Sequence, residues 1–253
     1  MEKQKICIIG GNLTGLVTAI ALSKLNCQID LITGNANLNH KSNRTIAISE
    51  DNFDFLNKLN IKKSLKREMW PCSIMKLYTK IRNEKFSKIF ELNNDNKQKK
   101  IFYMLENSKI MKFMISKIKQ IKSISIKSHE KISEISTSGL LKSVKINNNK
   151  LKYNLIIICA GNNSSLVKNL FNDQIIENSY KETSISTILT HSSLKNNTAR
   201  QIFLDNEILA LLPISNTKTA IVWSTKETMK EKNNLFLRKK IKFYAKNYLK
   251  NIT

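Results

Sequence analysis

The sequence has little proline, histidine, glycine or cysteine, and these shortages exclude several kinds of site. Among 253 residues there are 2 prolines, 3 histidines, 6 glycines and 4 cysteines. His40, His129 and His191 do not stand at metal-ligand spacing from other ligand residues, so we expect no metal. Without a C-x-x-C pair, the cysteines are expected to be buried, reduced thiols of a cytoplasmic protein. No apolar run approaches the length that spans a bilayer.

Acidic residues are also scarce, since 19 Asp and Glu stand against 43 Lys and Arg, for a formal net charge of +24. Such an excess is typical of proteins that bind nucleic acid or anionic membranes. The lysines are scattered along the whole chain, however, and no interleaving of aromatic and basic residues marks a nucleic-acid module. We therefore interpret most of the charge as a solvated surface and expect no nucleic-acid partner. The hydrophobic content of 41% excludes a disordered polymer.

The N-terminal residues predict a strand, a helix and a second strand. KICIIG (5–10) and QIDLIT (28–33) are short and rich in β-branched residues, whereas LTGLVTAIALSKL (13–25) has apolar residues at helical spacing. The connection GGNLTG (10–15) departs from the dinucleotide fingerprint G-x-G-x-x-G because Asn12 takes the place of the middle glycine. Asparagine tolerates positive φ, so we expect the turn to survive. On these residues alone, a plain strand-to-helix turn without a ligand is favoured.

Helical and alternating patterns continue to the C-terminus. Helices are predicted over the segment that contains Phe53 and Leu59, over 107–120, over 164–171 and from Asn233 to Lys250. Strands are predicted at 44–49, 73–81, 85–92 and 101–105, in a meander over 121–146, and in ETSISTILTH, RQIFL, EILALLPI and TAIVWS between 182 and 224. Trp70 and Pro71 mark a break. The apolar run 155–160 does not alternate, so we predict a strand that is covered on both faces.

Six segments in a fixed order carry a resemblance to a known family. They are ICIIGGNLTGLVTAIALSKLNCQIDLIT, RTIAIS followed by FLNKLNI, WPCSIMKLY, YMLENSKI, LIIICAGNNSSLV and IFLDNEILALLPISNTKTAIVWS. In these segments the sequence resembles the ubiquinone-biosynthesis hydroxylases, which are FAD-dependent aromatic monooxygenases with the p-hydroxybenzoate hydroxylase fold.

The resemblance implies an α/β (α+β) fold, in which a Rossmann-like FAD-binding domain is interleaved with a mainly antiparallel substrate-binding sheet. Residues 1–70 and 101–178 would form the FAD-binding domain, 71–100 and 179–225 the substrate-binding sheet, and 226–253 a terminal amphipathic helix. The implied reaction uses FAD, NADH or NADPH, and O2 to hydroxylate a polyprenylated aromatic ring in ubiquinone biosynthesis. The implied location is cytoplasmic, with peripheral contact at the inner face of the membrane and with other quinone-biosynthesis proteins as further expectations.

The resemblance also implies a cofactor site. Its members would be Gly10, Gly11, Asn12, Leu13, Thr14 and Gly15 around the diphosphate at a helix N-terminus, Thr33 at the ribose, Arg44 at a phosphate, and Gly161 at the flavin nucleotide. Thr33 stands where the family has a glutamate, and Ala160 where it has an aspartate. A neutral hydrogen bond is worth about 1 kcal/mol against about 1.5–3 kcal/mol for a charged one, so we expect lowered FAD affinity. No catalytic acid or base is implied, because the flavin supplies the chemistry.

One element of the family is missing from the sequence. Family members continue into a Gly-Asp motif, whereas this sequence contains no Gly-Asp dipeptide and its last glycine is Gly161. We therefore expect an incomplete hydroxylase. The alternative is a non-catalytic, degenerate partner in a membrane-associated quinone-biosynthesis assembly, whose basic terminal helix would suit anionic lipid. For that helix we favour packing on the nucleotide domain. Pro213 and Trp223 would lie in the substrate sheet, with Trp223 as a core residue.

Overall fold

The computed structural model of the chain describes residues 3–34, 44–61, 65–81, 85–94, 99–128, 132–161, 164–171, 174, 176, 178–226 and 234–253. The chain forms two compact units. The first unit comprises Met1–His40 and Ile110–Glu177, and the second comprises Lys41–Lys109 and Asn178–Thr253. Each unit is thus built from two stretches far apart in the sequence. The functional division into three regions that the sequence led us to expect stays a prediction.

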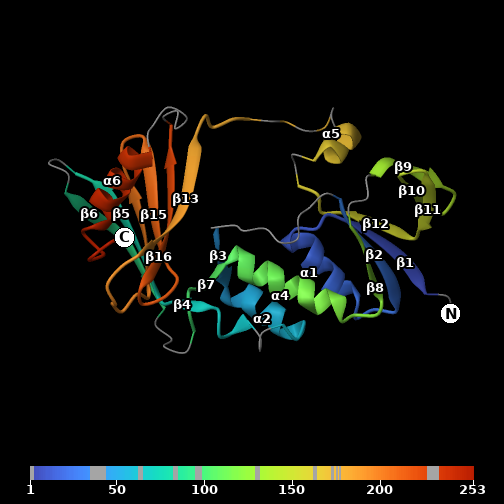
Figure 1. The fold of residues 1–253 in the computed structure, drawn as a ribbon, viewed down its shortest axis with the longest axis horizontal. Helices are drawn as coiled ribbons and strands as arrows, with labels where there is room; N and C mark the ends of the chain where they lie inside the picture. Colours follow the sequence, from blue (N-terminus) through green and yellow to red (C-terminus); the bar gives the residue numbers. More distant parts are fainter. Residues whose placement is uncertain are drawn as a thin grey trace. The chain divides into compact units, whose positions relative to one another are not determined.

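A parallel sheet with the strand order β12-β1-β2-β8 is the centre of the first unit (Figure 1). Its strands are Leu155–Ile158 (β12), Gln4–Ile9 (β1), Cys27–Gly34 (β2) and Ile124–Ser128 (β8). Helix α1 (Leu13–Leu22) connects β1 to β2 and contacts both, which is how a crossover makes two neighbouring strands parallel. Helix α4 (Asn107–Lys119) precedes β8. The apolar residues of its predicted stripe are all buried, namely Ile110, Met111, Met114, Ile115 and Ile118.

A three-stranded antiparallel sheet packs on one face of the parallel sheet. Its order is β11-β10-β9, from Asn149–Tyr153 (β11), Leu141–Ile146 (β10) and Ile132–Ser138 (β9). The core between the sheets contains Cys7, Ile9, Ile32, Val144, Ile146 and Tyr153. The short helix α5 (Ser165–Phe171) follows β12.

Two expectations for the first unit are wrong. The predicted meander over 121–146 includes β8, which instead pairs in parallel with β2. The strand predicted to be covered on both faces is β12, but its faces are only partly covered, and it is also an edge strand among the described residues. Leu155 is 48% exposed, and the rest of β12 is half-buried. A continuous apolar run therefore indicated a sheet strand correctly, although it did not indicate the position of that strand within the sheet.

The second unit contains a six-stranded sheet with the order β13-β16-β15-β14-β5-β6. The strands are Thr183–Thr190 (β13), Lys218–Thr225 (β16), Glu207–Pro213 (β15), Thr198–Phe203 (β14), Ile74–Lys80 (β5) and Phe86–Asn93 (β6). All neighbouring strands are antiparallel except β14 and β5, so the expected mainly antiparallel sheet is confirmed. The remaining elements are β3 (Thr45–Ser49), α2 (Glu50–Lys58), β4 (Trp70–Cys72), β7 (Phe102–Glu106) and α6 (Asn234–Ala245).

The break expected at Trp70 and Pro71 is instead the strand β4. It belongs to a three-stranded antiparallel sheet with the order β3-β7-β4, in which it pairs with β7. The indole Nε1 of Trp70 donates a hydrogen bond to the carbonyl of Asn196 at 2.5 Å. The side chain of Asn196 in turn donates to the hydroxyl of Thr219 on β16 at 2.9 Å. The tryptophan and proline therefore mark a connection between the two sheets of this unit.

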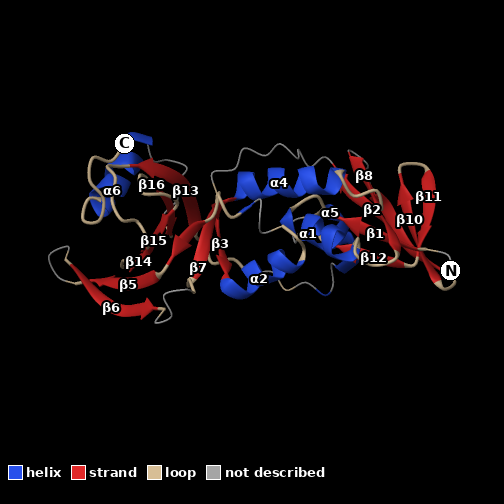
Figure 2. Ribbon diagram, turned by 90° about the horizontal axis from the view of Figure 1, so that it is seen from below, coloured by secondary structure: helices blue, strands red, loops and turns tan. Residues whose placement is uncertain are grey.

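Helix α6 covers one face of the six-stranded sheet (Figure 2). Ile241 and Ala245 of this helix share a buried cluster with Leu209, Leu211 and Trp223 of the sheet. The helix expected at the C-terminus is confirmed, and so is its apolar side. The expectation that it packs on the nucleotide domain is wrong, because its contacts in this cluster are with strands of the second unit.

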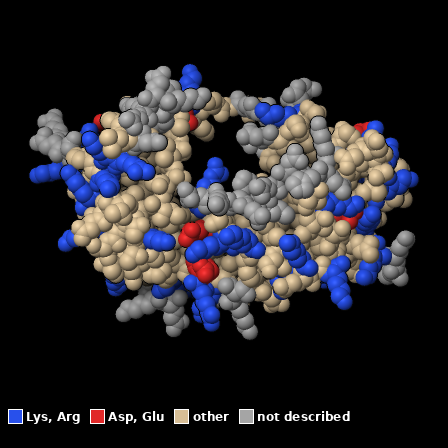
Figure 3. All heavy atoms as spheres, viewed as in Figure 1, with Lys and Arg blue, Asp and Glu red and all other residues tan. Residues whose placement is uncertain are grey.

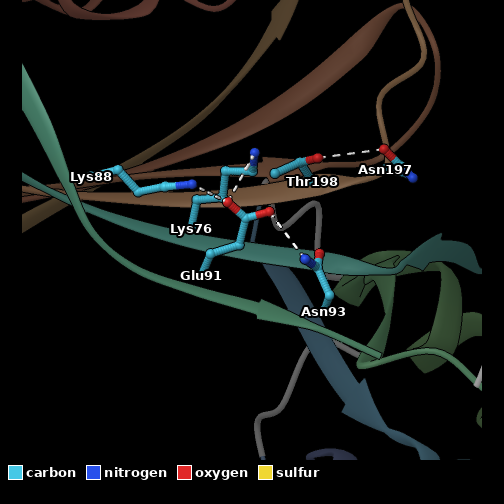
Figure 4. Close-up of polar contacts among 6 residues, drawn as sticks. All are labelled: Lys76, Lys88, Glu91, Asn93, Asn197 and Thr198. Atoms are coloured by element: carbon cyan, nitrogen blue, oxygen red, sulfur yellow. Dashed lines mark hydrogen bonds and ion pairs between the residues drawn. The ribbon is translucent and has the colours of Figure 1, made fainter. Parts of the chain in front are cut away.

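Glu91 on β6 is the centre of a polar cluster at the edge of the six-stranded sheet (Figure 4). Its carboxylate lies 2.5 Å from Lys88 Nζ and 3.4 Å from Lys76 Nζ. Asn93 Nδ2 also donates to it, at 3.1 Å. The hydrogen bond from Lys88, followed by that from Asn93 and the interaction with Lys76, lowers the pKa of Glu91 from 4.5 to about 2.

We expect the Glu91 cluster to make this edge of the sheet sensitive to acid. Because the pKa is lowered by folding, the stabilisation is present above the unfolded value of 4.5 and is lost as the pH falls toward about 2. Glu91→Gln should therefore be less stable than the wild type at neutral pH, and the difference should vanish across this acid range. Urea unfolding at several pH values measures it, with the exposed Glu182→Gln as a control expected to be neutral. A stability difference that does not change with pH would contradict the ion pair.

Candidate nucleotide-binding site

The carboxyl ends of three parallel strands meet at the turn between β1 and α1. The Gly10 N–H donates a hydrogen bond to the Ile32 carbonyl at 2.8 Å, and the Cys159 N–H donates to the Ile9 carbonyl at 2.7 Å. The turn, the end of β2 and the residue after β12 are therefore neighbours. In open α/β sheets, ligands bind outside the carboxyl ends of the strands, so this is the expected place for a nucleotide.

Gly10 and Gly15 are required by the packing of the turn itself. Gly10 has φ +130°, and a Cβ atom there would lie 2.4 Å from the Cys159 carbonyl oxygen. A Cβ atom at Gly15 would lie 2.0 Å from the Gly10 carbonyl oxygen. Both distances are far below van der Waals contact, so glycine allows the helix to approach the strand as closely as it does. This is the close packing that the fingerprint glycines of a dinucleotide turn provide.

Asn12 does not need the conformational freedom that we expected it to use. It is the N-cap of α1 with φ −83° and ψ 176°, an extended conformation that any L-residue adopts. The positive φ lies instead at Gly10. The Asn12 side chain is exposed and makes no capping hydrogen bond. The following residues, Leu13 and Thr14, are in the first turn of α1, where backbone N–H groups have no partner within the helix. The N-terminus of a helix favours the binding of anions, and the diphosphate of a dinucleotide is such an anion.

Thr33 lies at the end of β2, directly after Ile32, and it carries an unusual polar group. The residue is only 5% exposed, and among the described residues its hydroxyl has no hydrogen-bond partner. A buried hydroxyl without a partner costs about 1–3 kcal/mol, so its presence needs an explanation. Thr33 directly follows Ile32, whose carbonyl accepts the Gly10 N–H, so the residue adjoins the turn, and its contact with a ribose stays a prediction.

The segment after β12 has only some of the features that the resemblance implies for the cofactor site. Gly161 has φ +77°, and nothing lies within 4 Å of an added Cβ atom, so the backbone conformation explains this glycine. Ala160 is half-buried against the core between the two sheets of the first unit. It supplies no polar group where the family pattern has one. The segment thus has a glycine in a left-handed conformation and no charged side chain at residue 160, and the contact of Gly161 with the flavin nucleotide stays a prediction.

Arg44 lies in the second unit, next to β3, and its side chain is exposed. Its carbonyl accepts a hydrogen bond from the Asn107 N–H at 2.9 Å, which fixes the backbone there. The structure does not bring Arg44 together with the turn inside one compact unit. Its contact with a phosphate stays a prediction.

The six-stranded sheet of the second unit has a second, more open face. A row of side chains crosses five strands on the face opposite α6, and each is half-buried: Ser186, Val222, Ala210, Gln201 and Leu77. None of these side chains is charged. Trp223 is 1% exposed and lies on the α6 face, so the expectation of a core residue is confirmed and it does not line the open face. Pro213 is buried at the end of β15.

The four cysteines were expected to be buried, reduced thiols. Cys7, Cys27 and Cys72 are buried, Cys159 is half-buried, and all four are free. Burial, together with the nearby Asp30 carboxylate, raises the pKa of Cys7 to about 12. The expected buried thiols are therefore confirmed for three of the four. Within the described part of the chain, no group of three or more metal-ligating side chains is found.

Asp30 is a buried charged residue that was not predicted from the sequence. Asp30, on β2, is 8% exposed, and its carboxylate accepts a hydrogen bond from Tyr153 at 2.7 Å. Its only signal in the sequence is an aspartate inside an otherwise apolar strand.

Comparisons with known proteins support the family resemblance that the sequence shows. No protein-family model matches the chain. The chain is 24% identical over 260 residues to the ubiquinone biosynthesis monooxygenase COQ6 of Dictyostelium discoideum, an alignment that covers 87% of this chain and 52% of that protein. The chain therefore spans about half the length of this relative.

Solved structures agree on the fold. PqsL, a probable FAD-dependent monooxygenase from Pseudomonas aeruginosa, superposes with a TM-score of 0.77 at 12% identity, over 95% of this chain and 66% of that one. Klebsiella pneumoniae HpxO, solved with FAD and uric acid, gives a TM-score of 0.73 at 12% identity, over 95% and 61%. The chain thus has the fold of the FAD-dependent monooxygenases, and its sequence is similar to that of the ubiquinone-biosynthesis hydroxylases.

Proposed function

We propose that this chain binds FAD at the turn between β1 and α1 and acts within an aromatic-ring monooxygenase. The observation that carries the proposal is the buried hydroxyl of Thr33, which has no partner in the described part of the chain and adjoins the closely packed Gly10 turn. A turn that served packing alone would explain the glycines, whereas a ligand at the carboxyl ends of the strands would also give the Thr33 hydroxyl a hydrogen-bond partner.

The residues present fit FAD in part. The N-terminus of α1, with the backbone of Leu13 and Thr14, would hold the diphosphate, and Thr33 would bond a ribose hydroxyl. Arg44 and Gly161 are the further predicted contacts. Bound FAD, once reduced by NADH or NADPH, would activate O2 to insert one oxygen atom into an electron-rich ring. The chain contributes binding, orientation and exclusion of water.

The open face of the six-stranded sheet is the proposed wall for the substrate. The uncharged row that includes Ala210 and Val222 matches an apolar aromatic ring better than a charged metabolite. A polyprenylated ring of ubiquinone biosynthesis is the specific substrate that we propose, because the sequence is similar to COQ6.

A titration with FAD tests the proposal for the chain as given. The flavin fluorescence should be quenched as FAD is added to purified protein, with saturation at one FAD per chain. Protein that leaves the fluorescence unchanged at excess FAD would refute cofactor binding by this chain.

The second candidate function is a non-catalytic partner in a quinone-biosynthesis assembly. It is favoured by Asn12, Thr33 and Ala160, since none of the three matches the residue of the family pattern. The same titration separates the two candidates, because a non-catalytic partner needs no flavin.

Peripheral membrane contact belongs to this proposal as well. The apolar side of α6 is already used against the sheet, so the basic surface would have to provide it. In the described residues, no helix is both long and apolar enough to cross a membrane.

Replacing Thr33 by valine is expected to change stability and cofactor affinity in opposite directions. Valine has nearly the same shape but no hydroxyl, so the unpaired polar group disappears and the free protein gains about 1 kcal/mol of unfolding free energy. FAD affinity should fall about fivefold, because one neutral hydrogen bond is worth about 1 kcal/mol. Urea unfolding and FAD titration measure the two effects.

Ser143→Ala is the matched control for the Thr33 variant. Ser143 on β10 is 1% exposed and also has no hydrogen-bond partner for its hydroxyl among the described residues. Its replacement should stabilise the protein without changing FAD affinity. If Thr33→Val leaves FAD affinity unchanged, Thr33 does not contact the ribose.

A further inference from the structure

A basic hollow lies at the amino-terminal ends of β1 and β2, the end of the sheet opposite the candidate nucleotide site. Its volume is about 590 Å³, and it is lined by Lys3, Gln4, Lys5, Gln28, Leu141, Lys152 and Asn154. Lys5 and Gln28 are neighbours in register on the parallel sheet, whereas Lys152 belongs to β11. The hollow is therefore formed between the two sheets of the first unit.

The lining has the chemistry of an anion site. Three of the seven residues are lysines, three carry carboxamides, and none is acidic. The volume is within the range of about 300–1,000 Å³ that is typical of small-molecule sites. Lysine ammonium groups bind phosphate as point charges, and carboxamide N–H groups add neutral donors.

Lys5 is held in place by the buried carboxylate of Asp30, which does not line the hollow itself. Its Nζ lies 3.6 Å from the carboxylate of Asp30 and 5.1 Å from the centre of the Tyr153 ring. Asn154 fixes the backbone beside it, because its side-chain oxygen accepts the Lys5 N–H at 2.8 Å. The ammonium group is therefore positioned before any ligand arrives, which lowers the entropy cost of binding.

Asp30 does not neutralise this region. The same carboxylate also lies 3.4 Å from Lys127 Nζ, so one negative charge is shared by two lysines. Lys127 and Lys150 line a second hollow of about 290 Å³, in which no acidic residue takes part. Figure 3 shows how few acidic side chains lie among the lysines and arginines of the face in view. Five lysines and one aspartate leave a local excess of positive charge.

We propose that the hollow lined by Lys3, Lys5 and Lys152 binds a small anion that carries phosphate groups, such as a diphosphate. This site is separate from the proposed FAD site, because the two lie at opposite ends of the same strands. Its occupant neutralises the lysines and contacts the carboxamides of Gln28 and Asn154.

Calorimetric titration of the full chain with inorganic pyrophosphate, at about 50 mM salt to limit screening, tests the proposal. We expect one site per chain. The double variant Lys3→Gln/Lys152→Gln should weaken binding at least about tenfold, since two of the three ammonium groups that line the hollow are removed and only neutral donors replace them. Lys119→Gln/Lys122→Gln removes the same charge from exposed positions of the same unit and should leave the affinity within about twofold. Equal losses in the two variants, or no binding by the wild type, would overturn the proposal.

Two further arms identify the source of the phosphate and keep this site distinct from the FAD site. Saturating FAD should not displace pyrophosphate; displacement would show that pyrophosphate occupies the FAD site and would overturn the proposal. Vesicles that contain phosphatidic acid are added to the protein with and without pyrophosphate. Competition between them would indicate a lipid headgroup as the natural occupant, and absence of competition would indicate a free phosphate compound.

Discussion

Gly10→Ala is expected to destabilise the chain by roughly 2–6 kcal/mol and to abolish FAD binding. Two costs add at this position. The backbone at φ +130° strains any residue with a Cβ atom, at about 1–3 kcal/mol. The new methyl group would also lie 2.4 Å from the Cys159 carbonyl oxygen, which is backbone and cannot rotate away, so overpacking adds about 1–3 kcal/mol. Urea unfolding gives the stability, and flavin fluorescence gives the binding.

Other glycines separate strain from crowding. Gly139→Ala introduces a Cβ atom at φ +61° with nothing within 4 Å, so it should cost only about 1–2 kcal/mol and leave FAD binding intact. Gly15→Ala has no positive φ but would place its methyl group 2.0 Å from the Gly10 carbonyl, so it tests crowding alone. If Gly10→Ala were no more costly than Gly139→Ala, the close approach of β12 to the turn would be refuted.

Local periodicity predicted the parts of the fold that depend on one element at a time. The stripe of α4 and the apolar side of α6 are both buried as their spacing indicates. Because successive side chains of a strand point to opposite faces, β15 places Leu209 and Leu211 under α6 and turns Ala210 to the open face. In each case one repeating face meets one layer of core, so the sequence of the element contains the information.

Pairing between distant strands was not predictable in the same way. β8 has an alternating pattern like that of β9 and β10, yet it pairs in parallel with β2, about a hundred residues earlier in the chain. The place of β12 at the edge also depends on which strands pair with it. Alternation reports exposure of two faces and carries no information on the neighbour at either edge.

In the candidate site, too, the local features could be predicted from the sequence and the contacts between distant residues could not. The glycines of the turn were found from their spacing, but the reason for each of them is a contact with Cys159 or Gly10 that only the fold reveals. The unpaired hydroxyl of Thr33 and the lysines around Asp30 depend on side chains from strands far apart in the sequence. Polar groups of this kind have no period, so their function becomes visible only through burial and distance.

Glu207→Ala is expected to cost roughly 3–5 kcal/mol, the range observed when one partner of a buried ion pair is removed. Glu207 on β15 is 8% exposed. One carboxylate oxygen accepts a hydrogen bond from Trp223 Nε1 at 3.2 Å, and the other contacts Lys240 Nζ of α6. Lys240 also lies over the Trp223 ring, 5.1 Å from its centre. Alanine would leave a buried indole N–H and an ammonium group without their acceptor, and urea unfolding measures the loss.

Two variants distinguish the charge of this pair from its hydrogen bonds. Glu207→Gln keeps an acceptor for Trp223 and the volume of the side chain, so it should cost less than Glu207→Ala, about 1–3 kcal/mol. Lys240→Met leaves the carboxylate buried without its counter-charge and should cost more than Glu207→Gln. The double variant should then be more stable than Lys240→Met alone, since it removes the isolated charge. If the two effects simply add, Glu207 and Lys240 do not interact, and the docking of α6 depends on its apolar contacts with the sheet rather than on the buried pair.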